Sequence, residues 1–132
     1  MWRILVADDH LVDRRLIKQF LKGKAECHEA ADGNETILSY NFSIHEKMPY
    51  DVILMDIAMP KMEGAEVLRR IREDEKKRNV PPAQRVPAIA VSALPESEIK
   101  IGPDTFCAFV GKPMDPKDLL EKIEKAVSKP RF

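Results

Sequence analysis

The fold is decided by one stretch, Tyr50-Asp51-Val52-Ile53-Leu54-Met55-Asp56-Ile57-Ala58-Met59-Pro60. Its four consecutive apolar residues, bounded by polar ones and closed by a proline, are typical of a short strand buried on both faces. Such a strand belongs at the centre of a parallel sheet. Asp56 stands at its carboxyl end, the edge at which open α/β sheets bind ligands. A carboxylate there can be a helix cap, a structural acceptor or a reactive group, and the flanking sequence decides among these.

The same pattern recurs along the chain. Further apolar runs, the second of them weaker, predict four more strands at 3–7, 25–30, 86–91 and 106–110. Between the strands, apolar residues recur at three- and four-residue steps, which predicts amphipathic helices. These helices are expected at 11–22, from about 35, at 65–74, at 96–101 and at 116–127. Strands alternating with helices indicate an α/β protein with a five-stranded parallel sheet covered on both faces, a three-layer sandwich.

The helical spacing also predicts which side chains face the core. In the first helix these are Leu11, Val12, Leu16, Ile17, Phe20 and Leu21, and in the second Ile37, Leu38 and Phe42. The fourth helix is expected to be short or irregular, because proline and Gly102-Pro103 bound it closely. The charged and proline-containing segment 74–85 is expected to be a helix end followed by a surface loop.

Length and composition narrow the class of protein. With 132 residues, the chain fits a single domain, expected to span 1–132. Lys+Arg and Asp+Glu both number 22, so no overall basic field exists to hold a nucleic acid directly. No apolar run approaches the length of a membrane span or of a signal-peptide core, which favours a cytoplasmic location. Cys27 and Cys107 lack zinc-site or CxxC spacing and are interpreted as reduced, small hydrophobic residues.

Polar residues follow the predicted strands in a chemically coherent set. Asp8 and Asp9 follow the first strand, Asp56 ends the third, Ser92 the fourth, and Lys112 follows the fifth. The carboxyl ends of parallel strands share one edge, so these side chains can converge. Neighbouring carboxylates raise each other's pKa, and a divalent cation removes that conflict. Oxygen-only ligands favour Mg²⁺.

With Asp8, Asp9 and one oxygen of Asp56 on the ion, the other Asp56 oxygen is free to attack phosphorus as a carboxylate nucleophile. Lys112 and Ser92 can then hold the phosphoryl group through an ammonium and a hydroxyl. His10, next to the acid pair, could line the same site.

These motifs resemble the receiver domains of two-component response regulators. The resemblance rests on Asp8-Asp9, the stretch 54–60 followed by Gly64, Ser92-Ala93 and Lys112-Pro113, and it covers essentially the whole chain. It implies a flavodoxin-like sheet with strand order 2-1-3-4-5. Within the family the chain is similar to chemotaxis regulators, while the long 74–85 connection is more like the receivers of hybrid histidine kinases.

The resemblance assigns roles to individual residues. Asp56 is implied to be the phosphoacceptor, Asp8, Asp9, Asp56 and the backbone carbonyl of Ala58 the Mg²⁺ ligands. Ser92 is implied to be the switch hydroxyl, Lys112 the phosphate contact, and the Lys112–Pro113 peptide bond to be cis. Phe109 matches an aromatic residue that changes rotamer on activation, for which plain core packing is the alternative.

The expected function is that of a phosphoacceptor signalling module rather than an enzyme acting on other substrates. Its expected partners are a histidine kinase or histidine phosphotransfer domain and a downstream protein, with the chain a monomer or weak dimer. Two alternatives stay open at this point: a receiver-like scaffold that is never phosphorylated, and a phosphohydrolase with an aspartyl-phosphate intermediate. The hydrolase is disfavoured because Ala58 leaves no second acid near Asp56. A flavodoxin is disfavoured because acids stand where its phosphate loop needs donors.

Overall fold

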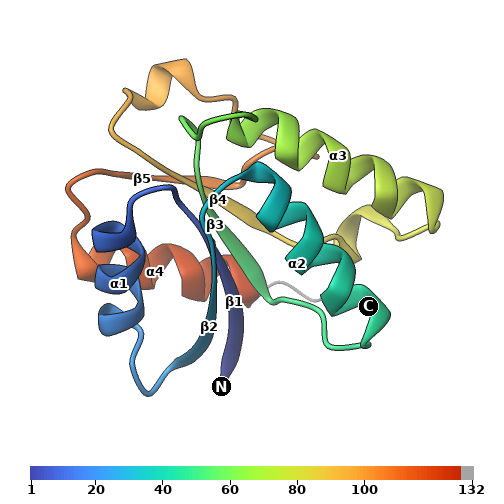
Figure 1. Cartoon of the computed structure of the whole chain (residues 1–132), viewed down its shortest axis with the longest axis horizontal. Helices are drawn as coiled ribbons and strands as arrows, with labels where there is room; N and C mark the ends of the chain where they lie inside the picture. Colours follow the sequence, from blue (N-terminus) through green and yellow to red (C-terminus); the bar gives the residue numbers. More distant parts are fainter. Residues whose placement is uncertain (129–132) are drawn as a thin grey trace.

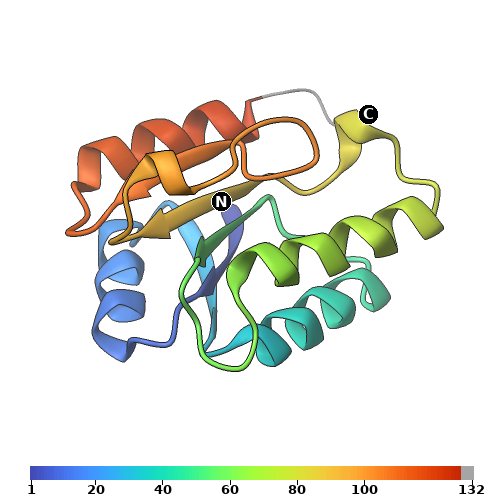
Figure 2. The same ribbon diagram turned by 90° about the horizontal axis from the view of Figure 1, so that it is seen from above.

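The computed structural model describes residues 1–128 and shows three layers around a central sheet (Figure 1). One face of the sheet is covered by α1 (Leu11–Phe20) and α4 (Pro116–Val127). The other face is covered by α2 (Gly33–His45) and α3 (Gly64–Lys77), which lie side by side (Figure 2). Each face carries its own apolar cluster, so the sheet is buried between two cores. The predicted α/β sandwich is confirmed.

All five strands are parallel, in the order β2-β1-β3-β4-β5. Their bounds are β1 Trp2–Ala7, β2 Ala25–Ala30, β3 Val52–Asp56, β4 Ala88–Ser92 and β5 Ala108–Gly111. Every residue of β3 and β4 is buried, which explains their continuous apolar sequence. The expected flavodoxin-like order is therefore confirmed, with the fourth and fifth strands each beginning two residues later than predicted.

Helix ends follow their capping chemistry. The Asp32 carboxylate accepts a hydrogen bond of 2.8 Å from the backbone N–H of Glu35, so α2 begins at Gly33, before the predicted start. Asp115 caps α4 in the same way, and Pro116 occupies its first turn as predicted. The helix α3 continues to Lys77, three residues beyond its predicted end.

The predicted inward faces of the first two helices need correction. Leu38 and Phe42 are 67% and 65% exposed, and Leu11 and Val12 are 52% and 76% exposed. In α2 the buried positions are Gly33, Thr36, Tyr40 and Ser43, a stripe that includes small and polar residues and turns the Leu38–Phe42 side to solvent. In α1 only the later turns pack on the sheet, through Ile17 and its partly buried neighbours.

The connection from β4 to β5 holds a single 3-10 turn, η2 (Glu96–Glu98), within the range 96–101 predicted for the fourth helix. The expectation of a short fourth helix is confirmed. A second 3-10 turn, η1 (Pro82–Gln84), lies in the predicted surface loop. A bridge between Ile101 and Phe106 closes the remainder of the β4–β5 connection. No helix within residues 1–128 combines the length and apolar character needed to cross a membrane.

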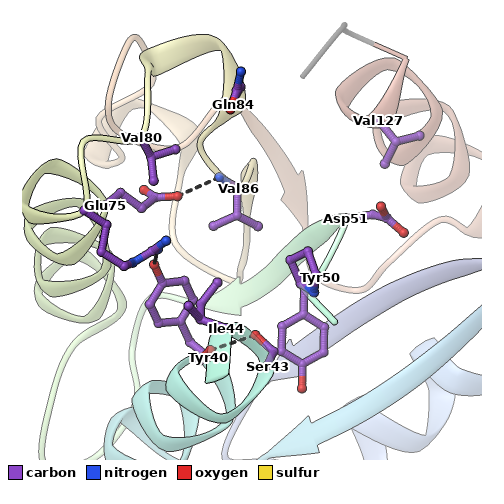
Figure 3. Close-up of a pocket in the computed structure, with 12 residues that line it drawn as sticks. Tyr40, Ser43, Ile44, Tyr50, Asp51, Glu75, Val80, Gln84, Val86 and Val127 are labelled. Atoms are coloured by element: carbon purple, nitrogen blue, oxygen red, sulfur yellow. Dashed lines mark hydrogen bonds between the residues drawn. The ribbon is translucent and has the colours of Figure 1, made fainter. Parts of the chain in front are cut away.

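A hollow of about 550 Å³ lies between the later turns of α2 and α3, away from the predicted site (Figure 3). On its α3 side, the carboxylate of Glu75, 2% exposed, accepts hydrogen bonds from the backbone N–H of Val86 at 2.8 Å and from Arg72 at 2.6 Å. On its α2 side, the Tyr40 hydroxyl donates to Asp74 at 2.8 Å. The Tyr40–Asp74 hydrogen bond therefore joins α2 to α3, and the Glu75–Val86 hydrogen bond joins α3 to the residues just before β4.

Candidate functional site

Three carboxylates meet where β1 and β3 end. Asp8 follows the last residue of β1, and Asp56 is the last residue of β3, its neighbour in the sheet. Their side chains are 2% and 5% exposed. One ligand atom each from Asp8, Asp9, His10 and Asp56 lies within 4.8 Å of the others. The structure thus brings together the acids predicted from strand ends 48 positions apart in the chain.

Lys112 connects the acids to β5, the strand at one edge of the sheet. Its ammonium donates to Asp8 at 2.7 Å, to Asp13 at 3.0 Å and to Asp56 at 3.3 Å. Its backbone N–H donates to the carbonyl of Ser92 at 2.9 Å, and the peptide bond to Pro113 is cis, as the resemblance implies. Burial alone would lower the pKa of Lys112, but the hydrogen bonds to the acids raise it well above its ordinary value. The side chain is therefore a permanent cation at neutral pH.

Asp56 is held in an environment that disfavours its charge. Burial raises the pKa of its carboxyl; Lys112 lowers that pKa, Asp8 raises it, and the net shift is upward. The backbone N–H of Ala58 donates to Asp56 Oδ1 at 3.1 Å and fixes the carboxylate. A Cβ on Gly64 would lie 2.7 Å from the backbone oxygen of Asp56. Only glycine therefore allows the start of α3 to lie this close to the site. A metal-binding role for the Ala58 carbonyl stays a prediction.

The two predicted switch residues lie beside this centre. Ser92 is 1% exposed, and its hydroxyl accepts a hydrogen bond of 3.1 Å from the backbone N–H of Leu94. Ser92 pairs with Gly111 in the register of β4 and β5, which places it next to the Lys112 loop. Phe109 is half-buried and packs against the core on the α2 and α3 face. The structure therefore places Ser92 next to the Lys112 loop and Phe109 against the core, and their switching roles stay predictions.

Two residues that contact the site were not predicted from the sequence. Asp13, which is not among the core-facing residues predicted for the first helix, accepts a hydrogen bond from Lys112. Arg14 donates to the backbone carbonyl of Asp8 at 2.7 Å and to Glu29 at 3.0 Å, which ties the loop after β1 to β2. The only available signal was their place in the first turn of a helix that directly follows the acid pair.

The donor set fits a hard divalent cation. Asp9 Oδ1 is buried and accepts no hydrogen bond among residues 1–128, although His10 Nδ1 lies 3.2 Å away and Asp8 and Asp56 are in the same cluster. A buried carboxylate oxygen without a donor is costly unless a cation compensates it. Carboxylate oxygens are the ligands that Mg²⁺ prefers. These residues therefore form a cluster able to bind a metal ion.

The family model of the response regulator receiver domain matches residues 4–124. The chain belongs to this family. Hybrid signal transduction histidine kinase I of Dictyostelium discoideum is 34% identical to this receiver domain over 133 residues, covering 96% of the receiver and 7% of the kinase. Chemotaxis protein CheY-3 of Vibrio cholerae is 30% identical, covering 93% of the receiver and 89% of CheY-3. The receiver thus spans a small fraction of its hybrid-kinase relatives and most of its chemotaxis relative.

Solved structures agree with this assignment. The receiver domain of sensor histidine kinase PA1611 from Pseudomonas aeruginosa, solved with a magnesium ion coordinated in its active site cleft, superposes with a TM-score of 0.76. It is 27% identical, and the match covers 96% of this receiver and 98% of that chain. The chain is a receiver domain of two-component signalling, and it carries an acidic cluster that could hold a metal ion.

Proposed function

We propose that this receiver domain accepts a phosphoryl group from a phosphohistidine onto Asp56 in a Mg²⁺-dependent reaction. One observation carries the proposal: the buried Asp56 carboxylate lies at the end of β3 with the Lys112 ammonium 3.3 Å away and the Asp8–Asp9 pair beside it. A nucleophile, a cation for the phosphoryl oxygens and a set of metal ligands are all present at one point. Phosphoryl transfer to a carboxylate requires no other kind of side chain.

Different residues have different roles in the proposed phosphoryl transfer. Asp8, Asp9, Asp56 and the carbonyl of Ala58 would hold Mg²⁺, which when bound neutralises charge on the phosphoryl oxygens. An Asp56 carboxylate oxygen forms a bond to phosphorus while the phosphorus–nitrogen bond of the phosphohistidine breaks, and the imidazole leaves with the electron pair. The product is an acyl phosphate on Asp56. Lys112 then holds the new dianion as a point charge.

Phosphorylation would act as a switch through Ser92 and Lys112. Each can form a charge-assisted hydrogen bond to the phosphoryl group, worth roughly 1.5–3 kcal/mol, or about 3–6 kcal/mol together. Converting a population from 1:99 to 99:1 takes about 5.5 kcal/mol, which lies at the upper end of that range. Movement of Ser92 would open space for the Phe109 ring and alter the face formed by the β4–β5 connection, β5 and α4. Nuclear magnetic resonance shifts that stayed confined to the surroundings of Asp56 on phosphorylation would contradict this.

The wider setting follows from the same proposal. The chain acts as a single receiver domain over residues 1–132, catalysing only its own phosphorylation and dephosphorylation. Its phosphoryl donor is a histidine kinase or histidine phosphotransfer domain, and its output is contact with a downstream protein. The CheY of Borrelia burgdorferi, 26% identical, was solved in complex with CheX, which supports the idea of a protein target for a receiver. We place the domain in the cytoplasm as a monomer or weak dimer, with no direct contact to nucleic acid.

Intact-mass spectrometry tests the proposal directly. The full chain is incubated with Mg²⁺ and acetyl phosphate beside an Asp56→Asn variant, and again with a chelator. A gain of one phosphoryl group in the wild type, absent from the variant and from the chelated sample, is the expected result. No gain under any condition would overturn the proposal and favour the scaffold that is never phosphorylated.

A further inference from the structure

His10 turns its imidazole toward the acids although the residue could reach solvent. Nδ1 lies 3.2 Å from Asp8 Oδ1, 3.2 Å from Asp9 Oδ1 and 4.0 Å from Asp56 Oδ2, while the side chain is 63% exposed. The backbone N–H of His10 donates to Asp8 Oδ1 at 2.9 Å, which fixes the residue beside the cluster. The imidazole nitrogen is therefore a fourth donor atom next to three carboxylates.

These separations suit one shared ion. Metal–ligand bonds of about 2.1 Å in an octahedral site place neighbouring donors about 3 Å apart and opposite donors about 4.2 Å apart. The nitrogen-to-oxygen distances of 3.2, 3.2 and 4.0 Å fall in that range. Asp9 Oδ1, one of the two oxygens nearest to the imidazole nitrogen, is a buried atom that accepts no hydrogen bond within residues 1–128.

We propose that His10 is a nitrogen ligand that makes this site prefer first-row transition metal cations over Mg²⁺. This inference rests on the proposed function, because it concerns the metal that the same acids bind. Mg²⁺ takes oxygen ligands almost exclusively, whereas imidazole suits Ni²⁺, Zn²⁺ and Cu²⁺. The other interpretation of the contacts is a hydrogen bond from His10 to Asp8, which would orient a carboxylate without selecting a metal.

Ni²⁺ and Mg²⁺ form a matched pair of probes, since both favour octahedral sites and differ in affinity for nitrogen. Their affinities are measured by isothermal titration calorimetry on the full chain and on His10→Ala. Loss of an imidazole ligand is expected to weaken Ni²⁺ binding about tenfold or more, in line with the effect of losing even an outer partner of a metal ligand. Mg²⁺ binding should change less than threefold.

Two controls identify the site. His45→Ala removes an exposed imidazole at the end of α2 and should leave both affinities unchanged. The double variant Asp8→Asn, Asp9→Asn should abolish the Ni²⁺ binding that His10 affects, which separates the site from adventitious binding elsewhere. Retained Mg²⁺ affinity in His10→Ala also shows that the variant is folded.

Equal losses for both cations in His10→Ala would show that the residue only orients Asp8, and unchanged Ni²⁺ affinity would show that it does not bind the metal. Either result overturns the inference. The titrations involve no phosphoryl transfer, so they are independent of the intact-mass test. Selective Ni²⁺ binding in a protein that never gains a phosphoryl group would refute the proposed function and leave the role of His10 intact.

Discussion

Replacing Lys112 by alanine should destabilise the protein markedly when no divalent cation is present. The ammonium contacts Asp8 and Asp56, whose side chains are 2% and 5% exposed, and Asp13, which is 29% exposed. Removing one partner from a buried ion pair typically costs about 3–5 kcal/mol. The contact with Asp13 adds little because water screens it. We expect a loss of about 3 kcal/mol in the free energy of unfolding, since Asp8 keeps its hydrogen bond from the backbone of His10.

Urea denaturation in the presence of a chelator measures this loss. Lys117→Ala, which removes an exposed lysine from the first turn of α4, serves as the matched control and should change the unfolding free energy by less than about 0.5 kcal/mol. Addition of Mg²⁺ should restore part of the stability of the Lys112 variant, because a bound cation stabilises the folded state by mass action.

The pH dependence gives the prediction a sign. The folded-state pKa of Lys112 is raised, so its contribution is complete below the ordinary lysine pKa and is lost as pH rises through the raised value. Without Lys112 the buried Asp56 carboxylate is unneutralised. Because the pKa of that carboxyl is raised, its protonation on acidification should shrink the difference in stability between variant and wild type. Equal stability of the two proteins at pH 7 under chelation would refute the reasoning, since it would mean that desolvation of the ammonium cancels its attraction to the acids.

Three further predictions concern the frame around the site. Gly64→Ala should lower the free energy of unfolding by about 1–3 kcal/mol and slow phosphorylation by acetyl phosphate, because its Cβ would lie 2.7 Å from the backbone oxygen of Asp56. Wild-type stability and a wild-type phosphorylation rate would contradict this. Glu75→Ala should cost about 3–5 kcal/mol in urea unfolding because it leaves a guanidinium and a backbone N–H buried without an acceptor, whereas Glu75→Gln should cost less. Leu38→Ala should change stability by less than about 0.5 kcal/mol and Ile71→Ala by about 2–5 kcal/mol, as their 67% and 1% exposures require; similar costs would mean that α2 packs differently.

The sheet and the strand-end acids could be predicted because buried parallel strands leave a strong local signal. Continuous apolar runs such as 52–55 have few other uses in a chain of this length, and the runs that end at 7, 55 and 91 are each followed directly by a polar residue. Since all carboxyl ends share one edge, the position of Asp56 in the sequence nearly determines its position in space. The convergence of the acids follows from topology, without knowledge of side-chain conformations.

The exposure of Leu38 and Phe42 could not be predicted from the sequence pattern. Apolar residues in α2 occupy more than one face, at 37, 38, 42 and 44, and small or polar residues such as Thr36 and Ser43 lie buried against its neighbours. Such a pattern allows more than one rotation of α2 about its own axis, so packing against α3 determines which residues of α2 are buried. The three hydrogen bonds of Lys112 could not be predicted from the sequence either, because they depend on the conformation of one long side chain that reaches Asp13.

The hydrogen bonds already present limit what phosphorylation alone can do. Ser92 accepts from the Leu94 N–H, and Lys112 gives its hydrogen bonds to three carboxylates. Both must give up contacts to meet a phosphoryl group. A lost neutral hydrogen bond is worth about 0.5–1.5 kcal/mol, and a lost hydrogen bond to a charged group about 1.5–3 kcal/mol. Subtracting such losses from a gross gain of about 3–6 kcal/mol leaves less than the roughly 5.5 kcal/mol needed for complete conversion. A partner that binds the active arrangement more tightly would have to supply the remainder, so the proposed switch is completed by its target and not by the phosphoryl group alone.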